Sequence, residues 1–130
     1  MLLVDDEAPL LRLLENFLTR NGYDTEAYNN PVEALARFEA DPAAFTLVVA
    51  DVTMPALSGV EMVRRLSDLS ADVRILLLSG FPFSTDRLPE PIRRRVGFLQ
   101  KPFVPNMLLE AVQELERRTS LYQRTSDSAC

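Results

Sequence analysis

Polar side chains stand at or just beyond the ends of four short apolar runs in this chain. They are Asp5, Asp6, Asp51, Ser79 and Lys101. Clustered carboxylates raise one another's pKa unless a cation neutralises them, and a hard divalent ion such as Mg²⁺ suits a site that also keeps waters and a substrate phosphate. An aspartate there can act as a nucleophile toward phosphorus. An ammonium and a hydroxyl can then stabilise the charge that develops on phosphoryl oxygens.

Short apolar runs alternate with amphipathic stretches along the chain. We expect strands near residues 2–4, 23–28, 45–50, 73–78 and 96–99, with helices between them. Several of these runs lack polar alternation, which is typical of a parallel sheet covered on both faces. Right-handed crossovers bring the C-terminal ends of all strands to one edge, where such folds bind ligands. The sequence therefore predicts an α/β fold in which the polar residues above converge in one pocket.

Helix boundaries follow from capping residues and prolines. Asn30 before Pro31, and Ser58 three residues before Glu61, predict two helix starts. The last helix should begin near Pro105. We divide the chain into one domain at residues 1–118 and a polar C-terminal tail at residues 119–130.

The segment before the fifth predicted strand is rich in proline. Pro89 and Pro91 cannot sit in a helix interior and disfavour helix at the residue before each. The fourth helix should therefore be short or irregular and begin no earlier than about Pro89. Our hypothesis is that this face binds a dedicated partner. We interpret the following Arg93–Arg95 as a solvated helix end.

The composition excludes several kinds of chemistry. The chain has 130 residues, no His, and a net charge of -5. Without His there is no Ser-His-Asp system and no His proton shuttle. The single Cys130 cannot form an intrachain disulfide or a CxxC site. No apolar run is long enough to span a bilayer and no signal peptide is evident, so we expect a cytoplasmic protein.

Taken together, the motifs resemble the receiver domain of two-component response regulators, including the chemotaxis regulators. The matching segments are Leu-Val-Asp-Asp-Glu at 3–7, Asp-Val-Thr-Met-Pro at 51–55, Ser-Gly at 58–59, Leu-Leu-Ser-Gly at 77–80 and Lys-Pro-Phe at 101–103. The resemblance implies a flavodoxin-like, doubly wound sheet of order 2-1-3-4-5 with helices on both faces. The sequence Leu-Ser-Gly-Phe at 78–81, where the fourth predicted strand ends, is similar to that of receivers attached to hybrid histidine kinases.

The resemblance also implies roles for the acidic residues. Asp51 corresponds to the phosphoacceptor, which takes a phosphoryl group from phosphohistidine. Asp5, Asp6 and Asp51 correspond to the Mg²⁺ ligands, completed by the backbone carbonyl of Thr53. Because this chain has no His, the donor must be another chain or domain, a histidine kinase or a histidine phosphotransfer protein.

Other positions correspond to the switch. Lys101 should pair with the phosphoryl oxygens, and Ser79 should move to hydrogen-bond the phosphoryl group. Phe98 stands where the family often has a switch Tyr, and it lacks the hydroxyl. Phe81, two positions after Ser79, should flank the phosphoryl group and exclude attacking water. Phosphorylation would then shift a two-state element rather than change the fold.

Two alternatives remain open at the level of sequence. An Asp-nucleophile, Mg²⁺-dependent phosphatase of the haloacid dehalogenase type would need a second Asp where this chain has Thr53. A receiver-like interaction module would never become phosphorylated. We favour a phosphoacceptor domain that is not an enzyme, that binds no DNA directly, and that is a monomer or weak dimer.

Overall fold

The computed structural model describes residues 1–52, 58–81, 86 and 88–129, with side chains described as far as Arg118. Strands and helices alternate along the chain. They are β1 (Leu2–Val4), α1 (Ala8–Arg20), β2 (Glu26–Tyr28), α2 (Pro31–Ala40), the short 3₁₀ turn η1 (Pro42–Ala44), β3 (Leu47–Asp51), α3 (Gly59–Leu69), β4 (Arg74–Ser79), α4 (Glu90–Arg93), β5 (Val96–Gln100) and α5 (Pro105–Ala129).

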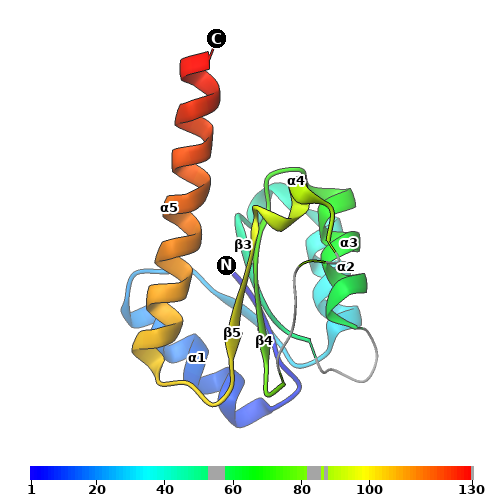
Figure 1. The fold of residues 1–130 in the computed structure, drawn as a ribbon. Coiled ribbons are helices and arrows are strands. Elements are labelled where there is room, and N and C mark those ends of the chain that lie inside the picture. Colours follow the sequence, from blue (N-terminus) through cyan, green and yellow to red (C-terminus); the bar gives the residue numbers. More distant parts are fainter. Residues whose placement is uncertain (53–57, 82–85, 87, 130) are drawn as a thin grey trace.

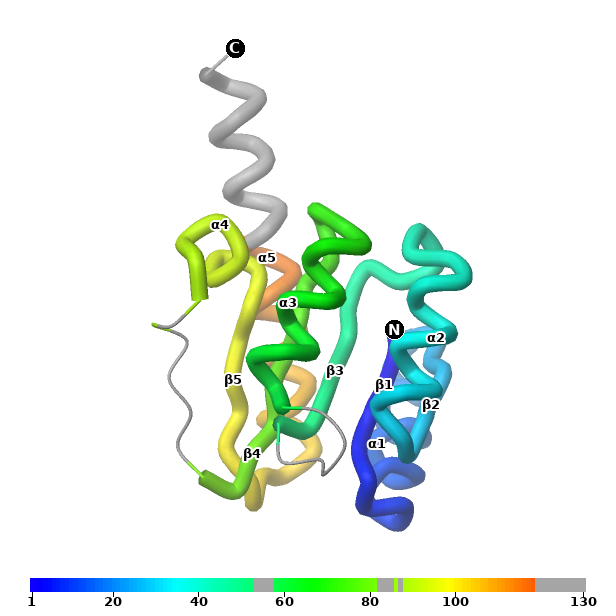
Figure 2. Tube along the Cα trace, turned by 90° about the vertical axis from the view of Figure 1, so that its right-hand side faces the viewer, coloured from blue at the N-terminus to red at the C-terminus, as the bar shows by residue number. Residues whose placement is uncertain are grey.

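The strands form one parallel sheet of order β2-β1-β3-β4-β5 (Figure 1). This confirms the predicted α/β class, the strand order and the flavodoxin-like arrangement. Each neighbouring pair is parallel, so the C-terminal ends of the strands meet at one edge, and Figure 2 shows the strands side by side in this order. Asp51 and Ser79 are the last residues of β3 and β4 and lie at that edge.

Helices cover the two faces of the sheet and bury separate apolar clusters. One cluster joins β-strand residues to α2, α3 and the segment around α4, with Phe38 and Leu66 fully buried. The other joins the opposite face to α1 and α5, with Leu18 and Leu115 fully buried. Central strands are therefore apolar on both sides, which explains why their sequences show no polar alternation.

The helix starts agree with the sequence. Asn30 Oδ1 accepts hydrogen bonds from the Val32 and Glu33 backbone N–H groups, at 2.8 and 3.4 Å. Ser58 Oγ accepts one from Glu61 N–H at 3.2 Å. The Glu61 carboxylate itself pairs with Arg65 on the next turn.

Strand β2 is shorter than predicted, and one prediction about α4 is confirmed. Strand β2 begins at Glu26, and residues 23–25, predicted as part of it, connect the turn at Asn21 and Gly22 to the strand. Helix α5 runs from Pro105 to Ala129, so it includes most of the segment described as a polar tail. Helix α4 covers only Glu90–Arg93, so it is short and begins after Pro89. Among the described residues, no helix combines the length and apolar character that crossing a membrane requires.

Gly59, the first residue of α3, lies against the residue that follows the end of β3. A Cβ at position 59 would lie 2.7 Å from Val52 Cβ and 3.2 Å from Val52 Cα. We expect Gly59→Ala to lower the free energy of unfolding by about 1–3 kcal/mol, because backbone must move to relieve the overlap. Urea denaturation measures this. Gly80→Ala is the matched control, because nothing lies within 4 Å of a Cβ there; equal losses in both variants would contradict the steric explanation.

Candidate functional site

The polar residues at the C-terminal edge of the sheet come from separate strands. Asp5 follows β1, Asp51 ends β3, Ser79 ends β4 and Lys101 follows β5. Asp5, Asp51 and Ser79 are almost fully buried, at 1%, 2% and 1% exposure. The structure therefore brings together the residues that the sequence predicted would converge. It also buries two carboxyl groups, Asp5 and Asp51, in positions where proteins usually place apolar side chains.

Lys101 holds the carboxylates together. Its ammonium donates to Asp5 Oδ2 at 2.9 Å, to Asp51 Oδ2 at 3.1 Å and to Glu7 Oε1 at 3.2 Å. Its backbone N–H also donates to the carbonyl of Ser79, at 2.7 Å. The peptide bond from Lys101 to Pro102 is cis. A compact ammonium with several donors suits a point where more than one carboxylate must be reached.

Burial and pairing shift the pKa values of Asp5 and Lys101, and three carboxylates share the one ammonium. Burial raises the pKa of Asp5, while hydrogen bonds from Glu7 N–H and Lys101 act in the opposite direction. Burial lowers the pKa of Lys101, but the hydrogen bonds and charges of Asp5 and Asp51 outweigh this and raise it overall. The lysine therefore stays charged and stabilises the fold at neutral pH. Ionised Asp5 still costs stability there, because one ammonium does not fully compensate its burial.

The donor set fits a hard divalent cation. Oxygen atoms of Asp5, Asp6, Glu7 and Asp51 all lie within 4.8 Å of one another. Asp6 and Glu7 are exposed, so an ion can reach the site from solvent. All-oxygen ligands with room for waters are what Mg²⁺ prefers. Thr53, whose carbonyl the sequence analysis assigned to the metal, lies outside the described residues.

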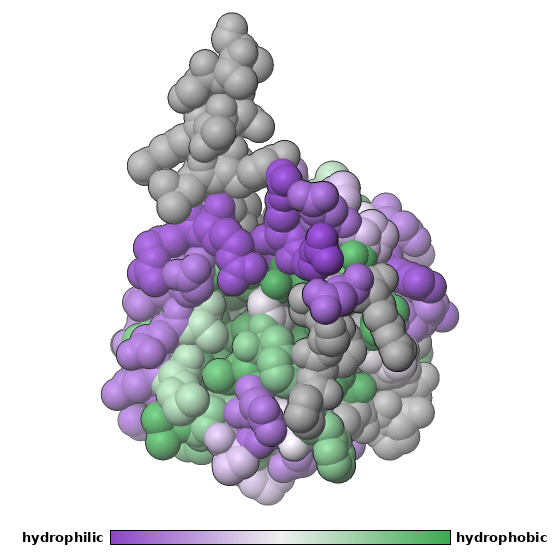
Figure 3. All heavy atoms as spheres, viewed as in Figure 1, coloured by the Kyte–Doolittle hydropathy of each residue, from purple (hydrophilic) through white to green (hydrophobic). Residues whose placement is uncertain are grey.

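Ser79 and Phe98, for which the sequence predicts a switch, lie on the neighbouring strands β4 and β5. Ser79 Oγ accepts a hydrogen bond from Phe81 N–H at 3.0 Å, which leaves the hydroxyl proton available for donation to another acceptor. Phe98 lies opposite Leu77 in the β4–β5 register and packs, partly buried, against the core. On the face that Figure 3 shows, apolar side chains gather between β5 and α5.

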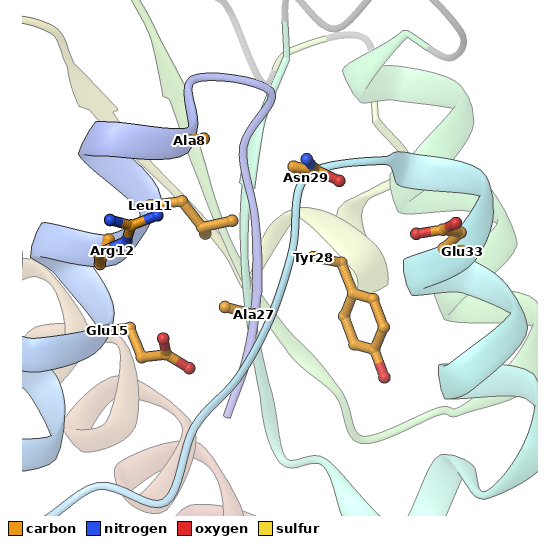
Figure 4. Close-up of a pocket in the computed structure, with 8 residues that line it drawn as sticks. All are labelled: Ala8, Leu11, Arg12, Glu15, Ala27, Tyr28, Asn29 and Glu33. Atoms are coloured by element: carbon orange, nitrogen blue, oxygen red, sulfur yellow. The ribbon is translucent and has the colours of Figure 1, made fainter.

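A hollow of about 580 Å³ opens beside Lys101. It is lined by Glu7, Leu10, Gly80, Phe81, Lys101, Pro102 and Phe103. Phe81 is 72% exposed, so it stands at the rim of the hollow without closing it. A second, smaller hollow lies beside β2, with Arg12 and Glu15 on one wall and Glu33 on the other (Figure 4). The acidic residues described above do not line this second hollow.

Glu7 is the one member of the site that the sequence analysis did not select. It lies next to Asp6, outside any strand, and bonds Lys101 while remaining 61% exposed. The signal was present in the sequence, because Glu7 directly continues the Asp5-Asp6 pair. An exposed loop acid is common, and its contact with a residue 94 positions away is visible only in three dimensions.

Comparison with known proteins decides the family. A profile described as the response regulator receiver domain matches residues 1–113. The chain belongs to this family. It is therefore a signalling domain of two-component systems, in which a receiver takes up a phosphoryl group and interacts with a histidine kinase or phosphotransfer protein.

Individual relatives of the receiver differ in length. Response regulator receiver protein CpdR of Brucella abortus is 29% identical over 117 residues, covering 90% of this chain and 93% of CpdR. Response regulator MprA of Mycobacterium leprae is 36% identical over 120 residues, covering 92% of this chain. The chain spans only about half of MprA, 51% of its length.

Solved structures agree with the fold. The chemotaxis response regulator CheY4 of Vibrio cholerae is 30% identical with a TM-score of 0.73, covering 88% of this chain and 95% of that one. The receiver domain of the hybrid histidine kinase CckA gives a TM-score of 0.74 at 24% identity, covering 88% of this chain and 95% of that one. The second likeness is one of fold alone.

Proposed function

We propose that Asp51 is the residue of this receiver that accepts the phosphoryl group. The observation that carries the proposal is the position of its carboxylate. It is buried at the end of β3, bonded to Lys101, and grouped with further acidic oxygens. No other acidic residue predicted for the site ends a strand. Asp5 and Asp6 follow β1, on a segment that the sheet places beside β3.

The transfer is a displacement at phosphorus. A carboxylate oxygen of Asp51 forms the new O–P bond while the N–P bond of a partner's phosphohistidine breaks. The bonding electrons leave with the imidazole nitrogen, which takes up a proton. Lys101, held 3.1 Å from Asp51 Oδ2, donates to the phosphoryl oxygens as their charge develops. Its place after β5 keeps it in position without a large rearrangement.

Asp5, Asp6 and Asp51 would hold Mg²⁺, together with the carbonyl of Thr53, and Glu7 adds a further oxygen nearby. When bound, the ion neutralises charge on the phosphoryl oxygens. Lys101 and the ion would together balance the charge of the carboxylates, because one ammonium alone leaves the pocket negative.

Ser79 and Phe98 would transmit the change. A phosphoryl group adds about 1.5–2 negative charges and new acceptor oxygens. Ser79 would donate its hydroxyl proton to one of these oxygens, favouring the state in which its side chain points inward. Phe98 would follow into the space beside β4. The partner would be a histidine kinase or phosphotransfer protein met in the cytoplasm, and attachment to a hybrid kinase is one setting for this receiver.

A small phosphodonor tests the proposal directly. The chain is incubated with acetyl phosphate, with Mg²⁺ or with a chelator, and its intact mass is measured. We expect a mass gain of one phosphoryl group that requires Mg²⁺ and that hydroxylamine removes, as it does from an acyl phosphate. A phosphorylated histidine kinase core should produce the same adduct.

Two results would overturn the proposal. Rapid turnover of many phosphate esters without a lasting adduct would indicate a phosphatase. Absence of an adduct from both acetyl phosphate and the phosphohistidine donor would indicate an interaction module that is never phosphorylated.

The lifetime of the adduct should depend on Phe81. Its ring stands at the rim of the hollow beside Lys101, and its N–H is tied to Ser79 Oγ. We expect Phe81→Ala to shorten the aspartyl-phosphate half-life several-fold, because water reaches the phosphoryl group more easily. The measurement follows loss of the adduct by intact mass after the donor is removed. Phe103→Ala, in the same hollow, is the control, and an unchanged half-life in Phe81→Ala would contradict the shielding role.

A further inference from the structure

The opposite edge of the sheet, where the strands begin, carries a row of arginines. Arg74 Nε donates to the carbonyl of Thr46, Arg95 Nη1 to that of Val73, and Arg118 Nη1 to that of Val96. The distances are 3.4, 2.8 and 3.4 Å. The three acceptors lie at the start of β3, β4 and β5, which are neighbours in the sheet. We call Arg74, Arg95 and Arg118 the arginine row.

The hydrogen bond holds Arg95 firmly and those of Arg74 and Arg118 orient their guanidinium groups more weakly, and none of the three neutralises the charge. Each guanidinium has several further N–H donors, and a carbonyl partner leaves its positive charge in place. Among the residues whose side chains the structure describes, no carboxylate lies within ion-pair distance of Arg74, Arg95 or Arg118. A guanidinium that is already oriented loses little freedom when it takes a second partner.

Nearby charges do not cancel the row. Asp72 is exposed and attracts Arg95 without a direct bond, and Glu116 accepts a hydrogen bond from Tyr23. The neighbouring Arg94 is paired with Glu90 of α4, and Arg117 with Glu114 of α5. Hydrophilic side chains cover this edge around α4 and α5 on the face seen in Figure 3. The guanidinium groups of the arginine row therefore present positive charge on a hydrophilic surface.

We propose that the arginine row is a docking site for an acidic segment of a partner protein. Neighbouring strands lie about 4.8 Å apart, so the three carbonyls to which the arginines bond span roughly 10 Å across the sheet. Carboxylates on alternate residues of an extended chain recur about every 6.8 Å, so two or three can reach it. Bidentate arginine–carboxylate contacts would give this surface its specificity.

Other polyanions fit less well. Nucleic acid binding depends on many phosphate contacts and is typical of basic domains, whereas this chain has a net charge of -5 and a pI near 4.7. Attraction to anionic lipid uses clusters of about 4–8 basic residues. A short acidic peptide meets only the row and avoids the negative opposite edge.

A fluorescein-labelled oligoglutamate peptide is the probe. Its binding is measured by fluorescence anisotropy at low salt, about 20 mM, and again at about 300 mM, where binding should weaken. We expect Arg118→Gln to weaken binding about five-fold or more. Arg118 is exposed, so this variant should remain folded, which circular dichroism checks. Arg95→Gln should act in the same way.

Arg12→Gln is the matched control, because it removes the same charge from α1, one turn beyond the acidic residues. It should leave binding unchanged, and so should Asp51→Asn, because the row does not depend on phosphorylation. No peptide binding, or equal weakening by Arg12→Gln, would overturn the proposal. Tighter binding to oligothymidylate or to phosphatidylserine vesicles than to the peptide would also overturn it. If Arg95→Gln does not fold, Arg118→Gln alone decides.

Discussion

Asp51→Asn is expected to abolish the phosphoryl adduct completely. Asparagine keeps the shape of the side chain and can still accept a hydrogen bond from Lys101, but its amide cannot attack phosphorus. The remaining carboxylates lie on the β1 side of the site and are close enough to bind a cation without presenting a nucleophile at the end of β3. Loss should therefore be all-or-none in the intact-mass assay rather than a graded decrease in rate.

Asp68→Asn is the matched control, because it makes the same change on the exposed surface of α3. It should leave the yield of adduct unaltered. A full adduct on Asp51→Asn would assign the acceptor to another acid, Asp5 or Asp6, and would refute the role of Asp51. Thermal denaturation of Asp51→Asn checks that its sheet remains intact.

Lys101→Met should separate metal binding from phosphoryl transfer. Methionine fills a similar volume but removes the cation that Asp5 and Asp51 share. Without its donor to the phosphoryl oxygens, the rate of adduct formation should fall roughly 10²–10³-fold. Affinity for Mg²⁺ should rise instead, by roughly tenfold or about 1.4 kcal/mol. The ion no longer competes with an ammonium bonded to the same carboxylates.

Stability should change in the same variant. In the presence of a chelator, Lys101→Met should lower the free energy of unfolding by about 3 kcal/mol, because the buried carboxylates lose their counter-charge. This is the low end for a broken buried pair, because the site opens to solvent. Added Mg²⁺ should restore more stability to Lys101→Met than to the native chain. Calorimetric titration and urea denaturation measure the two effects.

Lys101→Arg is the control for charge alone. It keeps a cation at the site but replaces the compact ammonium with a planar group. Transfer should fall less than in Lys101→Met, and Mg²⁺ affinity should remain near the native value. Weaker Mg²⁺ binding in Lys101→Met would contradict the competition between ammonium and ion.

Much of the fold follows from local patterns. Continuous apolar runs predicted the central strands, and Asn30 and Ser58 predicted helix starts that the structure confirms. Pro89 correctly limited α4. The residues that the sequence brought to the edge do meet there. The helix starts and strands were predictable because they depend on residues close in sequence. The meeting of the polar residues was predictable because the C-terminal ends of parallel strands lie at one edge.

The rest depends on contacts between distant residues. Glu7 was missed because only the folded chain brings it to Lys101. Arg95 resembled part of a solvated helix end, yet its guanidinium reaches back to the carbonyl of Val73. The polar residues from 119 onward gave no sign of secondary structure, yet α5 continues through them to Ala129, because polarity does not prevent a helix from forming. The roles of Asp51, Ser79 and Phe98 remain predictions until they are measured.

The hydrogen bonds of Lys101 also bear on how the sheet assembles. They join residues 96 and 50 positions apart, because Asp5 and Asp51 lie on paired central segments while the lysine arrives with the last strand. A partly folded chain with β1 and β3 paired but β5 undocked would bury two carboxylates with no counter-charge. Such a species is expected to be unstable and scarcely populated. The pocket therefore favours all-or-none folding, because docking of the edge strand β5 brings Lys101 to the carboxylates of Asp5 and Asp51.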